Sequence, residues 1–155
     1  MIVVHNSDPS AIEVGHFIAK MDGFNRMVID KGKENSPEEN ESLDNINLKL
    51  EIFTIVKEDT NKTHGGLMIS KACKMTTVES FWLDKYGRFY WDTLGHKLVE
   101  DAKASGQIGI FAHVGEYSKV MIRGMVRFNF KHIGSTSPKA GKWQRHFYYL
   151  DLLDE

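Results

Sequence analysis

The stretch FWLDKYGRFYWDTLGHKLVEDAKASGQIGIFAHVGEYSKVMIRGMVRFNF, residues 81–130, decides the fold class that the sequence predicts. Apolar runs and turn-forming residues follow one another in it, which indicates strand, turn, strand, helix, strand, hairpin and strand in that order. Leu94, Leu98 and Ala102 recur at intervals of four residues. We therefore expect an amphipathic helix from about Leu94 to Ser105.

Residues 119–131 show the clearest alternating pattern in the chain. The even positions from Val120 to Phe130 are apolar or glycine, and most odd positions are basic or methionine. Because side chains alternate between the two faces of a strand, we expect a half-buried strand here. Arg123 and Arg127 would share its polar face, where we expect either solvent or a bound anion.

Strands and a second helix are also expected outside this stretch. Residues rich in β-branched and aromatic side chains occur at 46–57, 67–69, 74–83, 108–112 and 145–153. Ser10 and Glu13 have the spacing of a capping box, which predicts an N-terminal helix that ends near Gly23. Together these elements predict an α+β fold: a mainly antiparallel, barrel-like (split-barrel) sheet with two helices.

Length and composition limit the class of protein to which the chain can belong. The chain has 155 residues, of which 41% are hydrophobic and 26% charged, so we expect a single domain, 1–155, that buries a core. The formal net charge of -1 gives no overall attraction to nucleic acid or membrane. No apolar run approaches the roughly 20 residues that span a bilayer. The single cysteine, Cys73, agrees with a reducing compartment, and we expect a soluble, cytoplasmic protein.

Residues 31–45 have no periodic pattern. Polar and acidic residues dominate this segment, together with glycine and proline. We expect an exposed, mobile acidic loop, because such a composition does not bury enough apolar surface to order the chain. Two interpretations stay open: a solvated loop, or a contact for a basic partner.

The sequence contains no recognisable catalytic or metal-binding motif. The seven histidines show no ligand spacing on a predicted helix, so no metal site is predicted. Neither a nucleophile elbow nor a phosphate-loop motif is present. No residue is identified as a catalytic acid, base or nucleophile.

Residues 76–128 resemble the core of the flavin-binding split-barrel proteins, the pyridoxamine-phosphate-oxidase-like group. The matching features are the turn Asp84–Gly87, an aromatic strand that ends in Thr93, a short helix with Lys97, and the strand Val120–Val126. The resemblance implies a protein that binds FMN or a similar phosphate-bearing cofactor. As an enzyme it would be an FMN-dependent oxidoreductase, in which the cofactor carries the chemistry.

The resemblance also implies three cofactor-binding residues, Thr93, Lys97 and Arg123. We add Arg127, which would share the polar face of the predicted strand, and Trp91, which lies just before the predicted helix, to complete the expected site. Thr93 and Lys97 would hold the phosphate at the entrance of the helix, where backbone N–H groups attract anions. Arg123 or Arg127 would close the site, and Trp91 would stack on the attached ring. The competing interpretation is that Thr93 is only a helix cap, Lys97 is solvated, and the arginines pair with nearby carboxylates.

Two non-enzymatic functions remain as alternatives. From residue 120 onward, a strand, a basic loop and an aromatic strand are similar to the first hairpin of an OB-fold, which favours a single-stranded nucleic-acid-binding module. The other alternative is a protein-binding regulator that uses the acidic loop or a sheet edge. The expected partner is a small phosphate-bearing ligand, with nucleic acid as the alternative, no membrane, and a homodimer left open.

Overall fold

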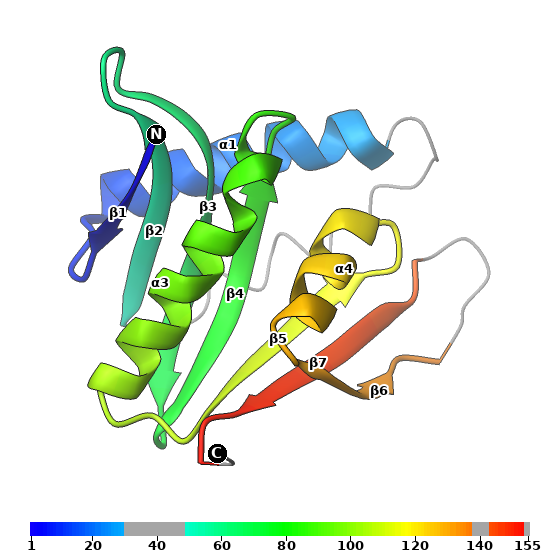
Figure 1. Cartoon of the computed structure of the whole chain (residues 1–155). Coiled ribbons are helices and arrows are strands. Elements are labelled where there is room, and N and C mark those ends of the chain that lie inside the picture. Colours follow the sequence, from blue (N-terminus) through cyan, green and yellow to red (C-terminus); the bar gives the residue numbers. More distant parts are fainter. Residues whose placement is uncertain (30–48, 138–142, 154–155) are drawn as a thin grey trace.

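The computed structural model describes residues 1–29, 49–137 and 143–153, so the acidic loop predicted at 31–45 lies outside the described residues. In these residues seven strands form one sheet, connected by three α-helices and a short 3-10 helix (Figure 1). The strands are β1 (Ile2–Asn6), β2 (Leu50–Lys57), β3 (Lys62–Ala72), β4 (Met75–Leu83), β5 (Gly109–Gly115), β6 (Lys131–Ser135) and β7 (Arg145–Asp151). The helices are α1 (Ala11–Ile29), η1 (Gly87–Tyr90), α3 (Trp91–Ala104) and α4 (Lys119–Arg127).

The sheet has the strand order β1-β2-β3-β4-β5-β7-β6. Neighbouring strands are antiparallel except β4 and β5, which run parallel. A parallel pair needs a crossover connection, and α3 provides it between these two strands. The sheet is mixed and open, with β1 at one edge and β6 at the other. The predicted antiparallel, barrel-like split barrel with two helices is therefore wrong.

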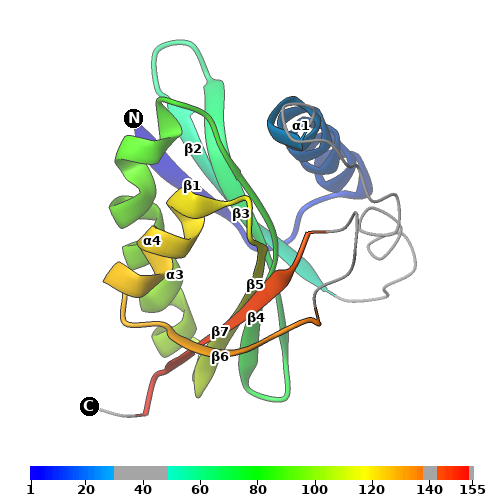
Figure 2. The same ribbon diagram turned by 90° about the vertical axis from the view of Figure 1, so that its right-hand side faces the viewer.

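Helices cover both faces of the sheet. In Figure 2, α1 lies on one face, and α3 and α4 lie together on the other. The larger core, beneath α3 and α4, includes Leu94, Leu98, Ile110 and Met125. The smaller core, beneath α1, includes Phe17, Met68 and Trp82. No helix in the described part of the chain combines the length and the apolar character needed to cross a bilayer.

The start of α1 forms the predicted capping box. The Ser10 N–H donates to Glu13 Oε1 at 3.1 Å, and the Glu13 N–H donates to Ser10 Oγ at 3.2 Å. The hydrogen bond from the Ser10 backbone, and then that of its side chain, lower the pKa of Glu13. The helix continues through Gly23 to Ile29, so its predicted end is wrong. One glycine inside a helix costs only about 1 kcal/mol, which the rest of a long helix outweighs.

Residues 119–127 form the helix α4, so the strand predicted over 119–131 is wrong. Met121, Gly124 and Met125 are buried, whereas the two arginines of this segment are exposed. The buried positions are spaced i, i+3 and i+4, which is the spacing of one helical face. The same residues therefore fit both periods, and packing against the sheet and α3 selects the helix.

The strand predicted at 88–91 is also wrong, because η1 occupies these positions and leads directly into α3. Asp84 turns the chain at the end of β4. Its Oδ1 accepts hydrogen bonds from the N–H groups of Tyr86 at 2.9 Å and Gly87 at 2.7 Å. The predicted amphipathic helix is confirmed as α3, which begins at Trp91 rather than at Leu94.

Candidate functional site

The strands β4 and β5 pair over a short distance and then separate. Their ladder runs from Met75–Gly109 to Val78–Ala112, and no further pair between them occurs in the described residues. Beyond it, β4 continues along β3 to Leu83, and β5 continues along β7 to Gly115. Figure 1 shows the two strands diverging. We call residues 79–83 and 113–115 the β4–β5 fork; its two inner strand edges lie within the sheet instead of at its outer rim.

A β-bulge marks the point where the fork opens. The register of β3 against β4 shifts between Met68 and Ile69, which leaves Glu79 as an extra residue on β4. A bulge bends its strand and increases the local twist, so it accounts for the divergence from β5. The Glu79 carboxylate accepts a hydrogen bond from Ser70 Oγ at 2.6 Å. Ser70 pairs with Leu50, which packs in the core beneath α1, so Glu79 lies on the α1 face of the sheet.

On the opposite strand, His113 is the first residue beyond the paired segment. Its neighbours Ala112 and Val114 belong to the core beneath α3 and α4. Because side chains alternate along a strand, His113 lies on the α1 face, as Glu79 does. Arg145 on β7 donates to His113 Nδ1 from its Nε at 3.2 Å and from its Nη2 at 2.9 Å.

These hydrogen bonds decide the protonation of His113. A guanidinium group only donates, so Nδ1 accepts, and the neutral ring carries its proton on Nε2. Burial, and after it the positive charge of Arg145, lower the pKa of His113 from 6.5 to about 4. At neutral pH His113 is therefore uncharged, and its Nε2 is a hydrogen-bond donor and not a base.

Aromatic side chains border these two polar groups on the α1 face. The rings of Phe111 on β5 and Phe147 on β7 are stacked, with centroids 5.9 Å apart. The Phe111 ring lies 6.4 Å from that of His113. All three side chains are half-buried. The α1 face beside the fork thus combines a carboxylate, an N–H donor and an apolar aromatic wall.

The five residues predicted to bind a cofactor lie on α3 and α4, on the other face of the sheet. Thr93 and Lys97 are exposed on α3, and Arg123 and Arg127 are exposed on α4. Thr93 is inside the helix, whose N-cap residue is Tyr90. Of these residues, Arg127 is brought to the helix entrance, where its Nη2 donates to Asp92 Oδ1 at 2.8 Å.

Trp91, the fifth predicted residue, is 4% exposed and packs α3 against α4. Its ring meets that of Phe128 edge-on, with centroids 6.1 Å apart. It also lies so close to Gly124 that a Cβ atom added there would be 2.1 Å from the indole Nε1. A side chain buried in this way holds two helices together and offers no free ring face to a ligand.

Neither Glu79 nor His113 is predicted from the sequence as a site residue. A bulge has no residue-type signature, so nothing in the sequence indicates that the strand bends at Glu79. His113 carries one usable signal, because it is a polar residue directly after the apolar segment 108–112. Its partner Arg145 is 32 positions away, and only the pairing of β5 with β7 brings them together.

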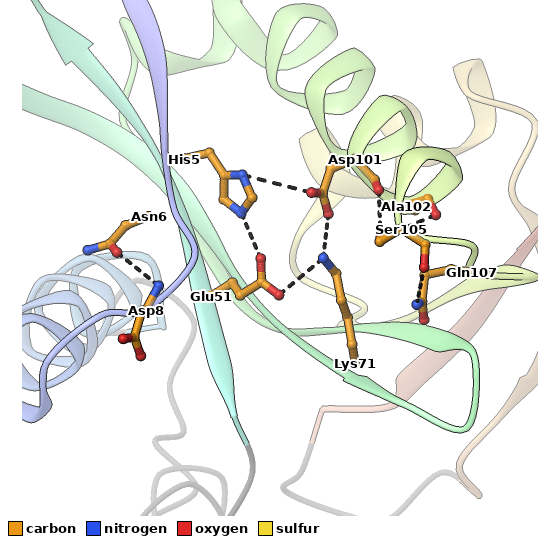
Figure 3. Close-up of polar contacts among 9 residues, drawn as sticks. All are labelled: His5, Asn6, Asp8, Glu51, Lys71, Asp101, Ala102, Ser105 and Gln107. Atoms are coloured by element: carbon orange, nitrogen blue, oxygen red, sulfur yellow. Dashed lines mark hydrogen bonds and ion pairs between the residues drawn. The ribbon is translucent and has the colours of Figure 1, made fainter.

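A second polar cluster joins the strands β1, β2 and β3 to α3 (Figure 3). The Lys71 Nζ atom lies 3.1 Å from Glu51 Oε2 and 2.9 Å from Asp101 Oδ2, and His5 Nε2 lies 2.7 Å from Glu51 Oε1. Burial alone would lower the pKa of Lys71, but the hydrogen bonds and charges of Asp101 and Glu51 outweigh it and raise that pKa. His5, Glu51 and Asp101 have the spacing of metal ligands. The Lys71 ammonium is the cation between the two carboxylates, and we assign the cluster a structural role.

The sequence matches no protein-family profile and no curated protein. Solved structures do share the fold. A GNAT-family acetyltransferase from Staphylococcus aureus superposes with a TM-score of 0.71 at 14% identity, over 97% of this chain and 99% of that one. The ribosomal-protein-S18-alanine N-acetyltransferase from Escherichia coli gives 0.69 at 13% identity, over 97% and 94%. A Klebsiella pneumoniae protein provisionally named an acyl-CoA N-acyltransferase gives 0.66 at 12% identity, over 97% and 96%.

These neighbours overturn the family and the functions expected from the sequence. The resemblance to the flavin-binding split-barrel group is wrong, and with it FMN as the cofactor and the flavin-dependent oxidoreductase. The alternative of a nucleic-acid-binding module or protein-binding regulator does not match the acetyltransferase neighbours either. The chain has the fold of the GNAT acetyltransferases.

Proposed function

We propose that this chain is an N-acyltransferase, which moves an acyl group from a thioester to an amine. The observation that carries the proposal is the β4–β5 fork, which leaves two strand edges facing each other inside a sheet. The shared fold supports it, because the neighbours named above are acetyltransferases or acyltransferases.

The fork suits one part of an acyl-CoA donor. Alternate backbone N–H and C=O groups of residues 79–83 point away from β3, toward the separated strand β5. Buried backbone groups of this kind need hydrogen-bond partners. The pantetheine arm of an acyl thioester is extended and carries two amide groups, so it is able to pair with a strand edge as an added strand does. The bound thioester supplies an activated acyl carbon whose leaving group is a thiol.

The residues of the α1 face are assigned to the acceptor amine. Acyl transfer forms a bond from the amine nitrogen to the acyl carbon, breaks the carbon–sulfur bond, and moves one proton from nitrogen to sulfur overall. Glu79 is the residue placed to accept that proton, because its carboxylate is half-buried at the opening of the fork. The Nε2–H of His113 is assigned to hold an acceptor atom of the substrate, and Phe111 to contact its apolar part.

Backbone amide shifts test this function directly. Uniformly ¹⁵N-labelled protein is titrated with an acetyl thioester of pantetheine or of coenzyme A, and the amide resonances are followed. We expect saturable shifts concentrated at residues 79–83 and 113–115, and release of free thiol when a primary amine is added. The structural control is α1, whose amides at 11–20 should stay unchanged. Absence of shifts in the fork with both thioesters at saturating concentration would contradict the proposal.

A further inference from the structure

The loop between β4 and α3 is the place where a pyrophosphate would be expected next to the fork. It leads into the N-terminus of α3, and helix N-termini attract phosphate groups through free N–H groups and partial positive charge. A coenzyme A donor whose pantetheine arm lies along β4 would bring its pyrophosphate near such a loop. The hydrogen bonds of residues 84–91 therefore test whether this part of the donor fits.

The carboxylate of Asp84 occupies the position at which the loop amides would bind a phosphate. Asp84 Oδ1 accepts the N–H groups of Tyr86 at 2.9 Å and Gly87 at 2.7 Å. The N–H of Arg88 donates to the backbone oxygen of Asp84 at 3.1 Å, and that of Phe89 donates to Tyr86 at 3.3 Å. The amides of residues 86–89 thus bind their own chain, and those at 86 and 87 bind a negative charge.

The carboxylate is held firmly in this position. The second oxygen of Asp84, Oδ2, lies 2.7 Å from Nδ1 of His64, which is 4% exposed. The loop is also packed against β3, because a Cβ atom added at Gly87 would lie 2.1 Å from the backbone oxygen of His64. Opening the loop for a phosphate would break the His64–Asp84 contact and leave a buried imidazole without it.

The residues that follow add bulk and a second negative charge. Phe89, Tyr90 and Trp91 occupy the end of η1 and the start of α3, where close approach of an anion to the backbone favours small residues. Asp92 is in the first turn of α3 and pairs with Arg127. The cations at the loop are the side chains of Lys85, which lies over the Tyr86 ring at 5.0 Å, and exposed Arg88. Neither of these side chains supplies the backbone N–H groups that Asp84 occupies.

We infer that this chain recognises its acyl donor by the pantetheine arm alone, with the β4–α3 loop closed to the pyrophosphate by Asp84. The inference rests on the proposed acyl transfer and names its donor class: a pantetheine thioester, whatever group the arm ends on. Of a coenzyme A donor, the pantetheine arm would therefore be bound by the fork, and the pyrophosphate would not be bound by the loop.

The test compares acetyl-pantetheine with acetyl-CoA in the same enzyme. We expect their kcat/KM values, and their affinities from the amide titration, to agree within about threefold, because the phosphates make no charge-assisted bonds to the loop. A preference of about 100-fold for acetyl-CoA, the size that such bonds give, would overturn the inference and leave the proposed function standing. If neither thioester binds the fork, the proposed function fails and this inference fails with it.

Variants at Asp84 make the comparison sharper. Asp84→Ala frees the two amides, so it should shift the ratio of kcat/KM values toward acetyl-CoA by about tenfold. Asp84→Asn keeps an oxygen acceptor for the same amides and is the matched control, with an unchanged ratio. If Asp84→Ala does not fold, the comparison of acetyl-pantetheine with acetyl-CoA in the wild type still decides whether the pyrophosphate is recognised. An unchanged ratio in a folded Asp84→Ala protein counts against the role given to this carboxylate.

Discussion

Arg145 donates two hydrogen bonds to Nδ1 of His113, from Nε at 3.2 Å and from Nη2 at 2.9 Å, and joins β7 to the strand at the opening of the fork. The contact fixes the tautomer of the imidazole with its proton on Nε2. Burial, and after it the positive charge of Arg145, holds the pKa of His113 at about 4. A histidine kept neutral in this way makes the stability of the protein depend on pH.

The His113 side chain should make the protein less stable in mild acid. Its pKa is lowered from 6.5 in the unfolded chain to about 4 in the folded one, so between these values the unfolded state binds more protons. The stabilisation is complete above pH 6.5 and is lost as the pH falls through about 4. Its full size is about 3 kcal/mol. Urea unfolding of the wild type and His113→Gln over this range should show a smaller loss in the variant.

The control for that measurement is His16→Gln. His16 is exposed on α1, so its replacement should leave the difference in unfolding free energy between neutral and acid pH as it is in the wild type. Equal pH dependence in the wild type and His113→Gln would show that His113 titrates normally and that the geometry assigned to Arg145 is wrong.

Gly124 should resist even the smallest substitution. In Gly124→Ala the new Cβ atom would lie 2.1 Å from Nε1 of buried Trp91, and the two helices would have to move apart. We expect a destabilisation of about 1–3 kcal/mol, as overpacking gives. Thermal unfolding measures it. Gly15→Ala is the matched control, because Gly15 has nothing within 4 Å of its added Cβ and should gain about 0.5–1 kcal/mol in the helix. Similar effects at both glycines would refute the packing of α4 on Trp91.

Lys71 should matter more for stability than an exposed lysine in an ion pair. Lys71→Met removes the ammonium between Glu51 and Asp101 and leaves two poorly solvated carboxylates near each other. We expect a loss of about 3 kcal/mol in chemical denaturation. The comparison is Lys57→Met, whose partner Asp59 is 70% exposed at the side chain and whose loss should cost less than about 0.5 kcal/mol. If the two variants lose equal stability, the cluster in Figure 3 does not hold α3 on the sheet.

Glu79→Gln should separate catalysis from folding. The amide oxygen of Gln still accepts the hydrogen bond from Ser70, so the bulge and the unfolding free energy should be preserved. The variant loses a proton acceptor, and we expect kcat for acyl transfer to fall by about 10²-fold or more with little change in KM for the thioester. Glu58→Gln, in the exposed turn after β2, is the control. An unaltered kcat in Glu79→Gln would remove Glu79 from the proton transfer.

The sequence by itself determined the elements whose signals are local. The capping box of Ser10 and Glu13 fixed the start of α1, since both partners lie within one turn. The stripe Leu94, Leu98 and Ala102 predicted α3, and all three side chains are buried. The final strand was predicted over 145–153 and forms β7 at Arg145–Asp151.

The tertiary structure alone decided the rest. Residues 119–127 fit a strand period and a helix period equally, and the choice depends on Trp91, which lies against Gly124 from another helix. The parallel pairing of β4 with β5 and the bulge at Glu79 depend on contacts between residues far apart in the chain. Local sequence patterns indicate which side chains are buried, but not which strands pair with each other. The fork and the site beside it result from these long-range strand pairings.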